Sequence, residues 1–330
     1  MNHCAHRRAG LKRSLAVTVA AALLLLTGGC SLFRKTVFYV NSYHEGHGPS
    51  DGVMAGIRES LRTSNVHLRV FMMDAGRYPD EELIQQKVEK ALFEVSLYEP
   101  DVMIVSDDAA VKHFLAASFA GGPVPCVFCG VDWRCDQYGL PTKYVTGMLE
   151  VAAVEKTIST IEGYYPDCRT VFVIAENSPS ERRSINALAP VYRRLGLRPS
   201  YALVDTYEQW KERFIEANAS ADLVYLSASG AIGGWDSVDA GRFVEERIKV
   251  PVLTCDQFMM PYAVFGLTKV PEEQGEWAAK TALQILAGKK PKDIPVVKNT
   301  QTKGYLNISL AEKIGFKPDE ELLSECQTVQ

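Results

Sequence analysis

The chain has 330 residues, which is enough for two domains of ordinary size. Hydrophobic residues make up 47% and charged residues 23% of it, the proportions of a water-soluble globular protein. The net charge of -4 argues against nucleic-acid binding, which favours a basic surface.

The N-terminus predicts export. A basic stretch that ends at Arg13 is followed by an apolar segment, residues 15–26, and then by Thr27-Gly28-Gly29-Cys30. This order is typical of a secretory signal, and the apolar segment is short for a membrane span. A Cys after Gly-Gly resembles the bacterial lipoprotein signal, residues 1–29, in which Cys30 is lipidated and becomes the new N-terminus. The alternative is an ordinary signal peptide or an uncleaved anchor, and in each case the chain that follows the signal is exported.

The exported chain is more acidic than the whole. Residues 1–29 carry four basic and no acidic side chains, so their removal changes the net charge from -4 to about -8. We expect the protein to be attached by its lipid to the bacterial cell membrane, facing the periplasm or the exterior.

Strands and helices alternate in the first half. Short apolar runs predict strands, and apolar residues at helical spacing predict helices. This alternation predicts a parallel sheet with helices on both faces. The expected strands are 36–40, 68–72, 102–105 and 126–128, and the expected helices are 50–63, 80–98 and 109–118.

The pattern returns after a crossover expected near Gly147. A less regular tail follows, with a strand at 262–266, a helix at 271–288, a strand at 294–298 and a short helix that begins at 305–307. A tail that crosses back between two lobes predicts a hinged clamshell with crossovers near Gly147, Gly266 and Pro291. In the second half the expected helices are 151–163, 180–195, 207–218 and 238–248, and the expected strands are 170–174, 198–204, 223–226 and 252–254.

The two halves echo each other. Asp101 to Ser106 matches Asp222 to Ser227, and Val124-Pro125 followed by Cys129 matches Val250-Pro251 followed by Cys255. This favours two copies of one αβ unit, although any two buried parallel strands look alike.

Several segments together resemble a known family. They are YVNSYHEG, VSDDAAVKHF, PCVFCGVDW, VTGMLE, GEWAAKTALQILAGKKPKDIPV and YLNISLAEKIGF. In order and spacing they are similar to the substrate-binding proteins of ABC transporters with a type I periplasmic-binding fold, and most of all to the branch with tryptophan and tyrosine binders. The turns at 106–108 and 175–180 depart from that branch, and the first looks more like related sensory members.

The resemblance implies a fold and a function. The fold is an α/β clamshell of two Rossmann-like αβα lobes with parallel sheets and three crossovers. One lobe would hold residues 30–148 plus about 266–291, and the other 149–265 plus about 292–330. The function would be that of a lipid-anchored, monomeric binding protein that passes a small polar, aromatic amino-acid-like ligand to an ABC permease. The alternative is a sensory lipoprotein that reports to a membrane kinase.

Ligands of such sheets gather where parallel strands end. Asp256 or Asp108 would pair with a ligand ammonium, and a ligand carboxylate would meet hydroxyls and helix N-termini. Tyr43 and Trp133 supply area for stacking. The alternative for each residue is a helix cap or a solvated turn. The expected ligand-binding residues are Ser42, Tyr43, Asp107, Asp108, Asp132 and Trp133 in the first lobe and Asn177, Ser178, Ser227, Ser229, Asp256 and Gln257 in the second.

Three motifs suggest other chemistry. Cys126 and Cys129 suggest a metal or redox pair. In a strand, however, they point to opposite faces of the sheet, so they are better interpreted as small apolar residues that pack in the core. The turn from His44 to His47 has too few ligands for zinc. Asp107-Asp108 has no accompanying catalytic motif. We therefore expect no enzyme, metal or cofactor, and disulfide pairing stays open.

Overall fold

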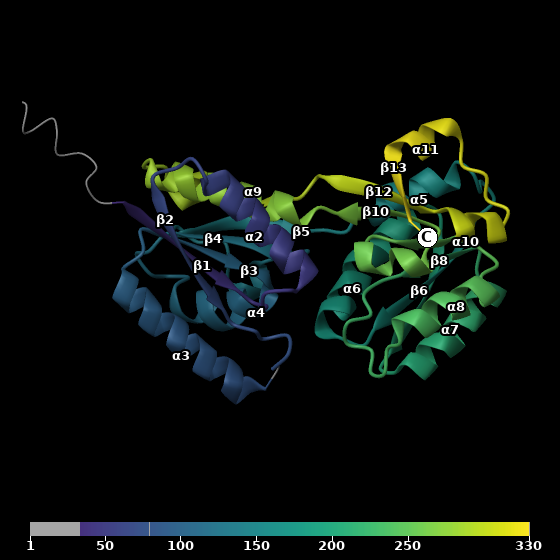
Figure 1. Ribbon diagram of the computed structural model, residues 1–330, viewed down its shortest axis with the longest axis horizontal. Coiled ribbons are helices and arrows are strands. Elements are labelled where there is room, and N and C mark those ends of the chain that lie inside the picture. Colours follow the sequence, from purple (N-terminus) through teal and green to yellow (C-terminus); the bar gives the residue numbers. More distant parts are fainter. Residues whose placement is uncertain (1–33, 79, 330) are drawn as a thin grey trace, which may run out of the picture.

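The computed structural model describes residues 34–78 and 80–329, which form two αβ lobes side by side (Figure 1). The expected signal segment and the lipidated Cys30 lie outside the described residues. Among the described helices, none has the length and apolar character that a membrane span requires.

The first lobe is built on a six-stranded sheet in the order β11-β5-β4-β3-β1-β2, in which every neighbouring pair is parallel. Helices cover both faces, and each face has its own apolar core. The strands are β1 Lys35–Asn41, β2 Val66–Met72, β3 Val102–Ser106, β4 Cys126–Asp132, β5 Val145–Glu150 and β11 Val297–Lys298. The helices are α2 Gly48–Leu61, α3 Glu81–Tyr98, α4 Asp107–Ala110, η1 Val111–Ala116, η2 Asp136–Tyr138, α9 Pro271–Leu286 and η4 Pro291–Asp293.

The second lobe has a seven-stranded sheet in the order β13-β12-β10-β9-β8-β6-β7, with β12 antiparallel to β10. Its core includes stacked and edge-on rings around the buried Trp210. The strands are β6 Thr170–Glu176, β7 Arg198–Val204, β8 Leu223–Leu226, β9 Val252–Thr254, β10 Phe265–Lys269, β12 Thr302–Asn307 and β13 Cys326–Val329. The helices are α5 Val154–Glu162, α6 Pro179–Arg194, α7 Tyr207–Ser220, α8 Ser237–Arg247, η3 Gln257–Tyr262, α10 Ile308–Lys313 and α11 Glu320–Glu325.

The internal echo is confirmed in three dimensions. The order β5-β4-β3-β1-β2 of the first sheet matches β10-β9-β8-β6-β7 of the second. The two matching aspartates form equivalent hydrogen bonds. Asp101 accepts one from the backbone N–H of Thr36 at 2.8 Å, and Asp222 accepts one from the backbone N–H of Thr170 at 2.9 Å. Each carboxylate therefore ties the start of one strand to the start of its neighbour.

The crossover predicted near Gly147 comes slightly later in the chain, because Gly147 lies inside β5. A Cβ there would stand 2.3 Å from the ring of Phe128 on β4, so glycine allows these strands to pack. The chain leaves the first sheet only after Glu150.

The tail also differs from the sequence prediction. Residues 305–307 end strand β12 rather than opening a helix, and α11 and β13 were not predicted. By sheet membership β10 belongs to the second lobe and β11 to the first, so the other crossings lie near 270 and 299–301 rather than at Gly266 and Pro291.

Buried polar side chains join the three crossing segments. The side chain of Asn299 accepts from the N–H of Val151 at 2.7 Å and donates to its carbonyl at 3.2 Å. Glu273, at the start of α9, accepts from the N–H groups of Thr300 at 2.9 Å and Gln301 at 2.8 Å. These bonds hold the crossings together as one hinge between the lobes.

Helix α9 follows a strand of the second lobe but packs on the first. It lies against α2 so closely that a Cβ on Gly275 would stand 1.9 Å from the carbonyl oxygen of Val53. The backbone contact is therefore possible only without a side chain at this position.

Gly275→Ala should lower the free energy of unfolding by about 1–3 kcal/mol, the usual cost of overpacking. Urea unfolding followed by circular dichroism measures this change. Gly241→Ala is the matched control, because Gly241 also lies in a helix and a Cβ there meets nothing within 4 Å. Equal stability of the two variants would contradict the contact between α2 and α9.

Candidate functional site

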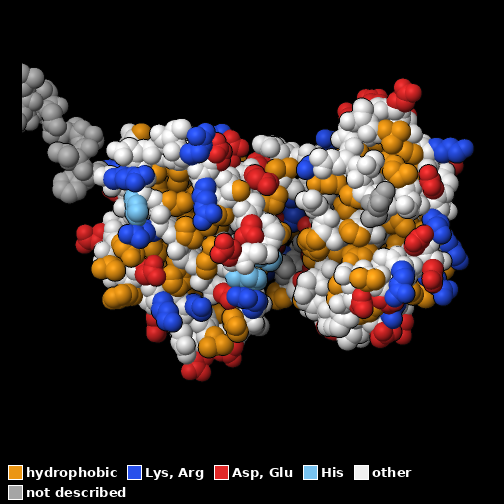
Figure 2. Space-filling model, in the orientation of Figure 1, with side chains coloured by type: hydrophobic (Ala, Val, Ile, Leu, Met, Phe, Trp, Pro, Cys, Tyr) orange, Lys and Arg blue, Asp and Glu red, His pale blue; other side chains and the backbone are white. Residues whose placement is uncertain are grey.

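A groove separates the two lobes (Figure 2), and the carboxyl ends of strands from both sheets meet around it. Acidic side chains stand at or near these strand ends and influence one another electrostatically within each lobe, and Lys269 and Arg183 of the second lobe act on Asp132 of the first. We call them the carboxylate cluster: Asp107, Asp108, Asp132 and Glu150 in the first lobe, and Glu176, Glu181 and Asp256 in the second.

Asp107 follows β3 with a left-handed backbone, at φ +69°. Its Oδ2 is buried and has no hydrogen-bond partner among the described residues. Burial and then the charge of Glu150 raise the pKa of Asp107 well above its usual range. A strained residue with an unpaired buried oxygen is a feature that binding sites often show.

Asp132 ends β4 and is the most informative member of the first lobe. Burial, followed by the nearby charge of Glu150, raises its pKa to about 8, against the opposing pull of Lys269. Asp108 accepts a hydrogen bond from the backbone N–H of Asp132 at 3.1 Å and another from the hydroxyl of Tyr138. Near neutral pH Asp132 therefore keeps a proton for most of the time.

The second lobe offers a similar group on α6. Burial raises the pKa of Glu181 to about 7, although the hydroxyl of Ser227 donates to its carboxylate at 2.7 Å. Its neighbour Glu176, at the end of β6, accepts from the N–H of Ala231 at 2.7 Å. The two lobes thus face each other with partly protonated acids.

Two cations join the lobes through the cluster. The ammonium of Lys269, at the end of β10, lies 2.7 Å from Glu150 of the first lobe and 3.1 Å from Asp256 of its own. Arg183 on α6 lies 3.2 Å from Asp108 across the groove, and its Nε is buried without a hydrogen-bond partner. These pairs offset part of the repulsion between the acids.

Aromatic side chains border the same space. Trp133 has a left-handed backbone at φ +61°, and its indole N–H donates to Ser184 Oγ of α6 at 2.9 Å. Trp133 therefore lies at the end of a first-lobe strand but packs against the second lobe. Tyr43 stacks on His47 with ring centroids 4.0 Å apart, and burial and then the charge of Asp107 raise its pKa.

The structure brings some predicted residues together and separates others. Asp107, Asp108, Asp132, Trp133, Tyr43, Ser227 and Asp256 meet around the groove. Ser42 is fully buried, donates to the carbonyl of Ser106 at 2.7 Å and accepts from the N–H of Ala110 at 2.8 Å, so its hydroxyl supports the turn.

The remaining predicted residues have local roles or exposed positions. Ser178 caps α6 by accepting from the N–H of Glu181. Asn177 is exposed and donates to Asp205 at 2.9 Å. Ser229 is buried after β8, and Gln257 is exposed at the start of η3.

Five residues of the site were not predicted: Glu150, Glu176, Glu181, Arg183 and Lys269. Glu176 ends β6, two residues beyond the predicted end of that strand. Glu150 and Lys269 end strands that were placed wrongly, and a correct boundary for β5 and β10 would have found them. Glu181 and Arg183 lie in a helix, where the sequence gives no sign that this end of α6 faces the other lobe.

The cysteine and histidine motifs that suggested other chemistry have structural roles, whereas Asp107 and Asp108 belong to the carboxylate cluster. Cys126 and Cys129 belong to the cores on opposite faces of the first sheet, as predicted. All six cysteines of the described part of the chain are free. His44 Nδ1 lies 3.2 Å from Asp74.

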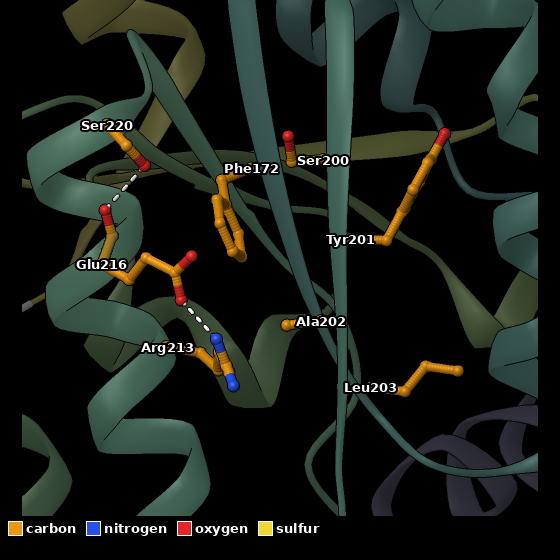
Figure 3. A pocket seen from close by; sticks show the side chains of 8 residues that line it. All are labelled: Phe172, Ser200, Tyr201, Ala202, Leu203, Arg213, Glu216 and Ser220. Atoms are coloured by element: carbon orange, nitrogen blue, oxygen red, sulfur yellow. Dashed lines mark hydrogen bonds and ion pairs between the residues drawn. The ribbon is translucent and has the colours of Figure 1, made fainter.

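A separate pocket of about 550 Å³ lies at the outer edge of the second sheet (Figure 3). It is formed by β7 and α7, with Tyr201, Arg213 and Glu216 among its lining residues. Arg213 and Glu216 pair with each other, and no member of the carboxylate cluster lines it. We therefore place the candidate site in the groove.

The model of the family described as ABC transporter substrate binding protein matches residues 94–330. The chain belongs to this family. It is thus a solute-binding protein of an ABC transporter, which holds a ligand between two lobes outside the cytoplasm. The family consists of binding proteins and not of enzymes.

Solved structures of similar proteins share the fold. A substrate-binding protein with adhesive properties from Clostridium difficile, in a ligand-free, open structure, has 14% identity and a TM-score of 0.71 over 90% of this chain and 99% of its own. The ABC domain from Streptococcus pneumonia in complex with L-Trp has 16% identity and a TM-score of 0.66 over 90% and 100%. A glucose-galactose binding protein from Geobacillus stearothermophilus has 16% identity and a TM-score of 0.57 over 82% and 97%.

These likenesses confirm the expected α/β fold of the type I periplasmic-binding proteins. The sequence has no match among curated proteins.

Asp132→Asn should stabilise this binding protein increasingly as the pH rises. The unfolded chain loses the proton of this acid at about pH 4, whereas the folded protein keeps it up to about pH 8. Between these two pH values the free energy of unfolding therefore falls as the pH rises. The variant should match the unaltered protein at pH 4 and exceed it by a margin that grows toward pH 8, by up to about 1.4 kcal/mol for each pKa unit of the shift. Urea titrations across this range measure the difference, and a constant difference would contradict the raised pKa.

Proposed function

We propose that this protein is a lipid-anchored solute-binding protein of an ABC importer, and that its solute carries an ammonium or a similar cationic group. The observation that carries the proposal is the carboxylate cluster, in which acids of both lobes gather at the groove and Asp107 has a buried oxygen without a hydrogen-bond partner among the described residues. The ligand and the anchor at Cys30 are both part of the proposal.

The charge of the groove favours a cationic solute. The carboxylate cluster outnumbers its cationic partners Lys269 and Arg183, and Asp107 keeps one buried oxygen unpaired. An ammonium placed about 4 Å from a carboxylate gains on the order of 4 kcal/mol at the effective dielectric constant of a protein surface. The positive charge of such a group would favour ionisation of the acids in the carboxylate cluster, so that binding releases their protons.

Aromatic amino acids are the first solutes to test. Trp133 and Tyr43 offer ring surface beside the acids, which suits a ligand that is apolar at one end and cationic at the other. The similar structure from Streptococcus pneumonia is a complex with L-Trp, which supports this class. Arg183 and Lys269, which pair with acids of the cluster in this structure, would also face the carboxylate of a bound amino acid.

Binding would be coupled to closure of the lobes. The crossings near 151–153, 270 and 299–301 are bonded to one another and belong to none of the cores, so the lobes can turn about them while the cores stay intact. A ligand that contacts both lobes stabilises the closed form by as much as it prefers that form over the open one. The permease would recognise the closed form.

A thermal-shift screen tests the class of solute. Amino acids, amines, nucleobases, sugars and oxyanions are compared, and a true ligand at 100 times its Kd should stabilise the protein by about 2.7 kcal/mol. We expect the melting temperature to rise with ammonium-bearing solutes and with aromatic amino acids above all. A rise with sugars or oxyanions alone would overturn the proposal.

Asp256→Asn then tests the site itself. We expect the affinity for the solute found in the screen to fall about 10- to 100-fold, the equivalent of about 1.4–2.7 kcal/mol. Isothermal titration calorimetry measures the affinity. Asp205→Asn is the control, since Asp205 bonds Asn177 on the exposed surface and should change little. Unchanged affinity in Asp256→Asn would place the ligand elsewhere.

A further inference from the structure

A second cavity, of about 430 Å³, lies at the end of the first lobe that faces away from the groove. It opens where β4 and β5 begin and where the chain leaves α9. Proline side chains, Tyr144 and Ile285 give it an apolar floor, and the lysines 143, 289, 290 and 292 line its rim. We call this surface the lysine pocket.

The lysine pocket has an uncompensated positive charge. All four lysines are exposed, and none forms an ion pair with a carboxylate among the described residues. Lys289 bonds the amide oxygen of Gln284 at 3.1 Å, and the ammonium of Lys143 lies 4.6 Å from the ring centroid of Tyr144. Asp293 is close in sequence but does not line the cavity. The carboxylate cluster lies at the opposite edge of the same sheet.

The lysine pocket is at the end of the lobe where the chain enters it. All strands of the first sheet are parallel, so β1 begins at the same edge as β4 and β5. The C-terminal end of α9 and the start of β1 lie at the same end of the molecule (Figure 1). The five residue-to-residue steps from Cys30 to Lys35 span at most about 17 Å when fully extended. If Cys30 carries the lipid, as in the proposed function, this edge is held within about 20 Å of the bilayer.

We propose that the lysine pocket binds the phosphate headgroups of an anionic bilayer and so orients the tethered first lobe on the membrane. Lysine ammonium groups pair with lipid phosphates, and each lysine near an anionic surface raises partitioning about fivefold. Tyr144 and the apolar floor suit the interfacial layer, where tyrosine is enriched. The carboxylate cluster then points away from the repelling lipid charge.

Vesicle flotation of a chain that begins at residue 31 tests this without the lipid. This chain keeps every residue of the three cores, which run from Val37 to Leu322, so it retains the complete fold. We expect it to float with vesicles that contain 30% phosphatidylglycerol, to stay behind with pure phosphatidylcholine, and to detach as salt is raised.

The double variant Lys290→Glu, Lys292→Glu should lower partitioning at least 25-fold, because two attractions become repulsions. The double variant Lys249→Glu, Lys317→Glu is the matched control, with the same change in net charge on exposed residues of the second lobe. It should float nearly as well as the unaltered chain, and an equal loss in both variants would show that only net charge matters and would overturn the proposal.

Two other outcomes would also overturn it. Equal flotation with both kinds of vesicle would show that lipid charge is not recognised. Binding of inorganic phosphate at the lysine pocket, seen by NMR without any flotation, would assign it to a soluble anion instead. Melting temperatures with the solute from the screen separate the two proposals, because the lysine variants should keep their solute affinity even where flotation is lost.

Discussion

Burial of carboxylates at the facing ends of two sheets, together with repulsion between neighbouring acids in each lobe, is the constraint on which this structure depends. Parallel strands place all their carboxyl ends at one edge, and the two edges meet at the groove. Acids that follow these strands, such as Asp107, Asp132 and Asp256, are therefore drawn into one partly dry space. The protein offsets the cost with Lys269 and Arg183 and by leaving some acids protonated. The pKa shifts, the ion pairs across the groove and the charge expected of the solute all follow from this arrangement.

The hinge allows the width of the groove to change. The side chains of Asn299 and Glu273 form hydrogen bonds with backbone groups of the crossing segments. The three segments are therefore linked to one another. Helix α9 is locked to α2 by the close approach at Gly275, which fixes it to the first lobe although the preceding strand belongs to the second. Each lobe can therefore move as a body, and the contacts across the groove, such as Asp108 with Arg183 and Trp133 with Ser184, are those expected to change.

The alternation of strand and helix was enough to predict the two sheets, and the turns after β3, β4 and β9 correctly placed Asp107, Asp108, Asp132 and Asp256. Glu150 was missed because Thr146-Gly147 indicated a turn, whereas Gly147 is needed for contact with Phe128. Lys269 was missed because β10 runs three residues beyond its predicted end. Arg183 and Glu181 depend on how α6 faces the other lobe, a relation between distant segments that local periodicity does not contain. Ser42 was predicted as a ligand contact because it follows a strand, but its hydroxyl is hydrogen-bonded to the backbone of Ser106 and Ala110 instead.

The proton balance of binding tests the central claim most directly. If a cationic solute enters a groove whose acids are partly protonated, with the pKa of Asp132 at about 8 and that of Glu181 at about 7, binding near pH 7 must expel protons. Isothermal titration calorimetry in buffers of different ionisation enthalpy counts them. We predict net proton release at pH 7 that disappears above about pH 9, where the acids are already ionised. Proton uptake, or the same balance at both pH values, would contradict the account.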